Sequence, residues 1–166
     1  VAALRLDLSD KVTTAFRSPT GAMALIYTLL LSADEPMRIG QLELLGRKLA
    51  PPILDQIHDL LPDIQNLDPR LKLPLINLTL PALRHLDLVQ YLQFPPLVQE
   101  LIEHDRAIDL FEYTLQKVLF RHLRSYYEPP ALPGVRYTSL KSLVTECSVL
   151  LSAMAHLGQD KEPAVS

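Results

Sequence analysis

The densest group of residues that could do chemistry lies between Glu103 and Glu112. Four carboxylates and one imidazole, that of His104, fall within these ten residues. Oxygen ligands at such spacing suit a hard divalent cation such as calcium or magnesium. Asp105, Asp109 and Glu112 are therefore the candidate metal ligands, in a turn and in the first turn of the helix that follows.

The same acidic residues also fit a purely structural role. Asp109 and Glu112 have the spacing of a capping box, in which the two side chains accept hydrogen bonds from each other's backbone amides. Acidic side chains are also favoured at a helix N-terminus by the helix dipole. An EF-hand loop would need more acidic residues and a turn glycine, which this stretch lacks. We favour capping, because it accounts for both residues without a metal.

No motif of a known catalytic centre accompanies these residues. The chain has no His-Glu-x-x-His, no Gly-x-Ser-x-Gly, no glycine-rich phosphate loop and no Cys-x-x-Cys. The remaining histidines have no positioned partner in the sequence, so packing or solvation explains them better than catalysis. We therefore expect that this chain is not an enzyme and holds no resident cofactor. The divalent cation discussed above is the one alternative.

Composition excludes several further classes of protein. The 166 residues carry 16 basic and 19 acidic side chains, so the basic footprint of a nucleic-acid-binding protein is absent. The most apolar stretch, residues 22–31, has about half of the roughly 20 residues that a membrane span needs. With a single cysteine, the chain is not a disulfide scaffold. We expect a soluble domain with no membrane span and no nucleic-acid partner.

Apolar spacing and proline placement predict an all-α fold. Residues 53–64 repeat apolar side chains at the spacing of one helical face, with acidic residues on the other face. Ser18-Pro19 and Asp68-Pro69 are typical of a capping residue followed by the first helical position, and Pro51-Pro52 opens another helix. The pattern predicts about seven or eight helices packed as a bundle.

Residues 71–86 are ambiguous, because their leucines partly alternate as in a strand. Pro74 and Pro81 would each remove a donor from a sheet, which favours a buried, kinked helix. We expect residues 22–31 and 71–86 to lie at the centre of the fold. A helix capped by Asp87 should be interrupted at Pro95-Pro96 before it restarts.

The last apolar stripe predicts a core helix over residues 140–157. Cys147 lies within this stripe, and we interpret it as a core residue and not as a reactive thiol. The expected organisation is an N-terminal helix or linker over 1–17, a single domain over 18–157 and a disordered tail over 158–166.

Two segments separated by 71 residues resemble each other. Each has the pattern of a helix, a short acidic turn and a second helix, so a duplicated helical hairpin is a candidate interpretation. Asp34 aligns with Asp105 and Gln41 with Glu112. The first copy has Arg38 at the position of Asp109, which weakens a repeated metal site.

Three stretches carry a resemblance to a known family. They are Gly21-Ala22 with Ala24-Leu-Ile-Tyr27, the run from Leu67-Asp-Pro-Arg70 into residues 73–84, and Ile108-Asp-Leu-Phe-Glu112 with Leu115-Gln116 and Arg121-His-Leu123. Over about residues 18–157 the chain resembles the C-terminal region of bacterial HtpX-like zinc metallopeptidases, in which a protease domain with His-Glu-x-x-His comes first. That region is similar to TerB-like domains, which are all-helical, contain a duplicated helical unit and often bear acidic residues in the turn.

The resemblance implies an accessory role. This chain would be a non-catalytic interaction domain of a membrane-associated zinc metalloendopeptidase of the protein quality control type, with zinc bound in the parent's protease domain. Its partner would be a protein, or that protease domain itself, on the cytoplasmic side of a bacterial inner membrane. The alternative is a metal-binding TerB-like sensing module that uses Asp105, Asp109 and Glu112.

Overall fold

A computed structural model describes residues 8–104, 109–128 and 139–159. Over these ranges the chain forms eight α-helices and one short 3-10 helix, with no strand. The predicted all-α fold is confirmed. Contacts between Cα atoms divide the chain into two units, residues 1–129 and 130–166, where the sequence predicted one domain over 18–157. Each unit is described by itself.

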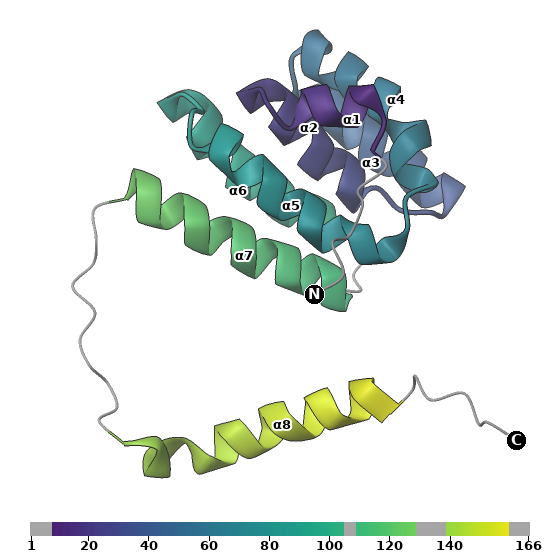
Figure 1. Cartoon of the computed structure of the whole chain (residues 1–166). Coiled ribbons are helices and arrows are strands. Elements are labelled where there is room, and N and C mark those ends of the chain that lie inside the picture. The colour runs from purple at the N-terminus through teal and green to yellow at the C-terminus, as the bar shows by residue number, and fades with distance from the viewer. Residues whose placement is uncertain (1–7, 105–108, 129–138, 160–166) are drawn as a thin grey trace, which may run out of the picture. The chain divides into compact units, whose positions relative to one another are not determined.

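The described residues of the first unit form seven helices, which follow one another along the chain (Figure 1). They are α1 (Asp10–Ala15), α2 (Pro19–Leu30), α3 (Glu35–Lys48), α4 (Pro51–Gln65), α5 (Pro69–Leu83), α6 (Leu88–Ile102) and α7 (Leu110–Tyr127). Residues 10–15, expected to belong to an N-terminal helix or linker, form α1, which packs on α2 and α4 through the buried Val12.

Helix α2 is the centre of this unit. It has no charged side chain, every residue from Gly21 to Leu30 is buried, and it packs against α1, α4, α5 and α6. Gly21 is required for this packing, because a Cβ there would lie 2.4 Å from the Ala15 carbonyl oxygen. The prediction that residues 22–31 are central is confirmed.

Local capping sets the helix starts as the sequence predicted. Ser18, Asp68 and Asp87 each accept a hydrogen bond from a backbone amide in the first turn of the helix that follows. Proline occupies the first turn of α2, α4 and α5, where its missing amide hydrogen removes no helical hydrogen bond. Residues 71–83 are helical, as predicted.

The helix capped by Asp87, α6, was expected to be interrupted at Pro95-Pro96, and this expectation is wrong. That helix continues through Pro95 and Pro96 to Ile102, and α4 continues through Pro62 to Gln65. Each internal proline removes a backbone donor, so such a helix is weak by itself. Tertiary packing offsets the loss in α6, whose buried side chains include Phe94, Leu97, Val98 and Leu101.

The second unit comprises the 3-10 helix η1 (Leu140–Leu143) and α8 (Val144–Gln159). Ser139 caps η1, and the two helices contact each other. The prediction that Cys147 lies in a core is wrong, because Cys147 is exposed. Periodicity shows that a helix has an apolar face, but it does not show what covers that face.

None of the helices that the structure describes has the length and apolar character needed to span a bilayer.

Candidate functional site

The acidic residues at the start of α7 form a complete capping box. The Asp109 carboxylate accepts from the Glu112 amide at 2.7 Å, and Glu112 Oε2 accepts from the Asp109 amide at 3.0 Å. These bonds satisfy two of the backbone donors that a helix start leaves without an intrahelical partner. The capping interpretation of Asp109 and Glu112 is confirmed.

The geometry gives the metal hypothesis no further support. Asp105, the third candidate ligand, lies outside the described residues. Within the part of the chain that the structure describes, no cluster of three or more His, Cys, Asp and Glu side chains could hold an ion. Asp109 and Glu112 line a surface pocket of about 230 Å³ together with Lys72, whose ammonium lies 5.1 Å from the centre of the Phe111 ring. A positive charge that lines the same pocket as the carboxylates opposes binding of a divalent cation.

Asp109→Ala is expected to lower the free energy of unfolding by about 1 kcal/mol, because the cap of α7 is lost. The loss should be the same with or without calcium, magnesium, manganese or zinc at about 1 mM, since a cation that binds the native state would add stability only while its ligands are present. Thermal unfolding measures both. Asp87→Ala is the matched control, because it breaks the capping box of α6 and lies away from the acidic turn. A metal-induced rise in melting temperature in the wild type that Asp109→Ala alone removes would contradict this expectation.

Both segments of the predicted repeat have the order helix, connection, helix, but the residues that cap their second helices do not align. Helices α2 and α3 are joined by residues 31–34, and α6 and α7 by residues 103–109. Asp34 caps α3, and the residue that caps α7 is Asp109, not the aligned Asp105. The buried Gln41 fastens the first turn, accepting from the Ser32 amide at 2.8 Å and donating to the Leu30 carbonyl at 3.3 Å. The alignment at a separation of 71 residues therefore pairs residues with different roles. Gln41 holds the connection after α2, whereas Glu112 is part of the capping box of α7.

Two tyrosines lock the end of α7 onto α6. The Tyr91 and Tyr127 rings stack with centroids 4.1 Å apart, and the Tyr127 hydroxyl donates to the Leu86 carbonyl at 2.8 Å. The Tyr91 hydroxyl donates to Glu128 at 2.9 Å. These contacts give Tyr91 and Tyr127 a structural role.

Stability of the first unit is expected to fall above about pH 10. Burial raises the pKa of the Tyr27, Tyr91 and Tyr127 phenols above the ordinary value. In the unfolded chain these groups lose their protons at lower pH than in the folded chain, so the unfolded state binds fewer protons and gains relative stability as pH rises. Urea unfolding followed by circular dichroism at increasing pH checks this. Tyr27→Phe should flatten the decline, whereas Tyr113→Phe, at an exposed position on α7, should not.

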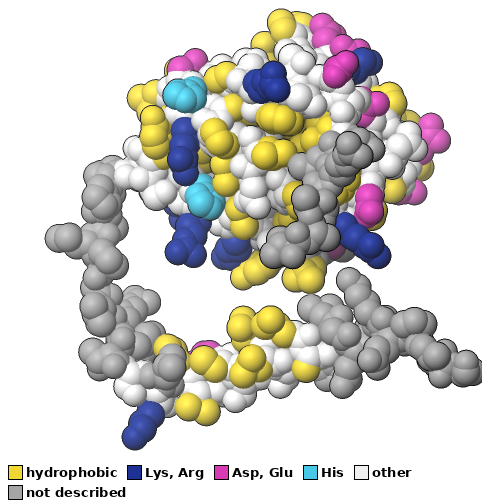
Figure 2. Space-filling model, viewed as in Figure 1, with side chains coloured by type: hydrophobic (Ala, Val, Ile, Leu, Met, Phe, Trp, Pro, Cys, Tyr) yellow, Lys and Arg dark blue, Asp and Glu magenta, His cyan; other side chains and the backbone are white. Residues whose placement is uncertain are grey.

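Helix α8 carries a group of exposed apolar side chains (Figure 2). By helical spacing Val144, Leu150, Leu151 and Met154, each 59–64 % exposed, fall on one side of the helix with Cys147, whereas Val149, 66 % exposed, falls on the other. Glu146 is the one charged residue between Val144 and Ala155. Isolated exposed apolar residues are ordinary, but a contiguous stripe is typical of a surface that binds something. The sequence revealed this stripe and could not show that it is uncovered.

Comparison with known proteins returned no match: no family model, no curated protein and no solved structure shows significant similarity to this chain.

Proposed function

We propose that this chain is a non-catalytic protein-interaction module, and that it serves as an accessory region of a membrane-associated zinc metallopeptidase. The observation that carries the first part is the exposed apolar stripe of α8. The second part rests on the resemblance of residues 18–157 to the TerB-like region that follows the protease domain in HtpX-like enzymes.

The chemistry of α8 favours a protein groove as its binding site. Apolar residues at helical spacing are the anchors by which an amphipathic helix binds in an apolar groove of a partner. Helices that lie on anionic membranes carry lysine and arginine on their polar face. Residues 144–159 contain neither, so a membrane surface has no charge to attract. The partner that fits is a protein with a mainly apolar groove and few charges. By the resemblance to HtpX-like enzymes, the protease domain is the candidate for this partner.

The complete sequence of the parent protein tests the metallopeptidase assignment. We expect a His-Glu-x-x-His motif on the N-terminal side of the region that corresponds to this chain. A parent without that motif would overturn the assignment, whatever α8 binds.

Isothermal titration of the full chain into the separately produced protease region tests the interaction. We expect saturable binding with a negative heat-capacity change, because apolar surface is buried. Vesicles of phosphatidylglycerol and phosphatidylethanolamine should not bind. Binding to the vesicles, together with no binding to the protease region, would overturn the proposal.

A further inference from the structure

The solvent-exposed face of α6 combines a row of apolar side chains with a pocket beside it. Val89 and Leu92 are 63 % and 62 % exposed, and Pro96 is exposed one turn further on, so the three form a single row along the helix. Leu92 and Pro96 also line a pocket of about 540 Å³ between α6, α2 and the α3–α4 connection, where Met23 and Tyr27 contribute from α2. The α6 face, meaning this row and the pocket, belongs wholly to the first unit.

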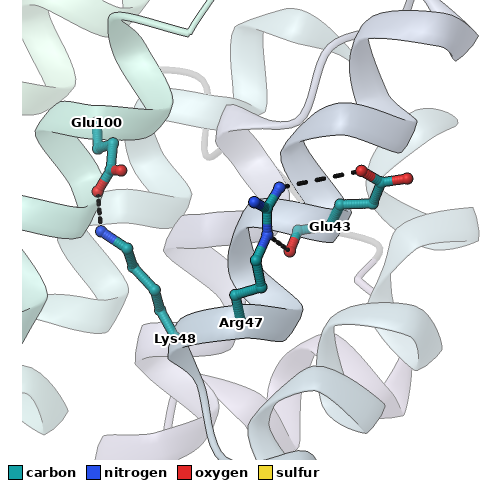
Figure 3. A network of polar contacts seen from close by, with 4 residues as sticks. All are labelled: Glu43, Arg47, Lys48 and Glu100. Carbon is teal, nitrogen blue, oxygen red and sulfur yellow. Dashed lines mark hydrogen bonds and ion pairs between the residues drawn. The ribbon is translucent and has the colours of Figure 1, made fainter.

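The α6 face carries no unpaired charge. From Leu88 to Gln99 the helix contains no acidic, basic or histidine residue. The next residue, Glu100, is paired with Lys48 at the end of α3, with Oε2 and Nζ 2.5 Å apart (Figure 3). The neighbouring Arg47 points to Glu43 on its own helix and leaves that pair intact. A charged partner would therefore find no counter-charge here, whereas two copies of the face can meet without repulsion.

The hydrogen-bonding groups of the α6 face suit a second copy of the same face. Gln90 and Gln93 line the pocket, and Gln93 is exposed. An amide both donates and accepts, so it can pair with the same amide of another chain. The Leu92 carbonyl needs a donor, because the residues three and four positions later are Pro95 and Pro96, which have no N–H. The Gln93 side chain of a second copy supplies one.

We propose that the α6 face joins two copies of this chain about a two-fold axis. In such an interface the same patch of both copies meets, so the patch must contain both a projection and the space that receives it. The row of Val89, Leu92 and Pro96 in each copy packs into the pocket of the other. The Gln93 amides, between the row and the pocket, lie near the axis.

The size of the α6 face sets the expected affinity. Helix α6 has 15 residues and is about 22 Å long, so the interface is smaller than the roughly 800 Å² per partner of a standard one. We therefore expect a weak dimer, with a dissociation constant on the order of 10–100 µM. This association is independent of α8 and of the proposed interaction with a protease.

Sedimentation equilibrium of the full chain at about 5–500 µM brackets that constant and tests the association. Leu92→Lys should weaken it at least about tenfold, because each ammonium group would have to enter the apolar pocket of the other copy. Leu92 is exposed, so the variant should fold, which an unchanged urea midpoint checks. The control is Leu150→Asp with Leu151→Asp on α8, which should dimerise as the wild type does.

A disulfide tests the position of the axis. In a Cys147→Ser background, Gln93→Cys should form a covalent dimer on mild oxidation, since residues near a two-fold axis lie opposite their own copies. Asp55→Cys, exposed on α4 and outside the pocket, should form much less. The proposal is overturned if the wild type stays monomeric up to about 500 µM. It is also overturned if Leu92→Lys leaves the dimer unchanged, if the α8 pair abolishes it, or if the two cysteine variants crosslink equally.

Discussion

Phe94→Ala is expected to destabilise the first unit by about 3–5 kcal/mol, the largest stability effect that we predict for a single substitution. Phe94 is wholly buried and packs edge-on against Tyr27, so the substitution leaves a cavity beside α2. Its position on α6 increases the effect. Pro95 and Pro96 remove two backbone donors from the middle of that helix, which therefore depends on its buried side chains.

Urea unfolding of the Phe94→Ala variant measures this effect. The chain has no tryptophan, but five of its six tyrosines lie in residues 1–129, so near-ultraviolet circular dichroism reports mainly on the first unit. Leu88→Ala is the matched control, because Leu88 is an apolar residue of the same helix and is 65 % exposed. It should change the free energy of unfolding by no more than about 0.5 kcal/mol. Equal effects of the two variants would contradict the central role of Phe94.

The helix starts could be predicted because the interactions that fix them are local. Asp68 and Asp87 accept hydrogen bonds from amides two or three residues further along the chain, so a short window of sequence contains both partners. The same holds for the site, where Asp109 and Glu112 are three residues apart and their reciprocal bonds follow from that spacing.

The course of α6 could not be predicted in this way. A proline has a known local cost, but the burial that offsets it comes from helices distant in the sequence. Phe94 packs on Tyr27, 67 residues earlier in the chain. The pocket beside Tyr27 was missed for the same reason, since α2, the α3–α4 connection and α6 contribute to it together.

The apolar stripe on α8 shows a second limit of prediction from the spacing of apolar residues. The spacing of Val144, Leu150, Leu151 and Met154 correctly indicated an amphipathic helix. Such spacing predicts a core helix, because apolar faces are usually covered within the same domain. The exposed fractions show that these side chains are not covered in the described unit. A binding partner is one explanation of such an exposed face. This explanation predicts the effect of substitutions in the stripe.

Replacing Leu150 and Leu151 together by aspartate is expected to weaken binding to the protease region by at least about a hundredfold. Each leucine would lose its place in an apolar groove, and each new carboxylate would have to lose its water on binding. The two leucines are exposed, so the substitutions should leave the near-ultraviolet signal and the urea midpoint of the first unit unchanged. Isothermal titration and urea unfolding of the same sample measure the two effects.

The matched control is Thr145→Asp with Ser152→Asp, which adds the same charge to the other face of α8 and should bind as the wild type does. Equal weakening by both pairs would mean that added charge alone weakens binding, and unchanged affinity of the leucine variant would show that the protease region does not bind the stripe.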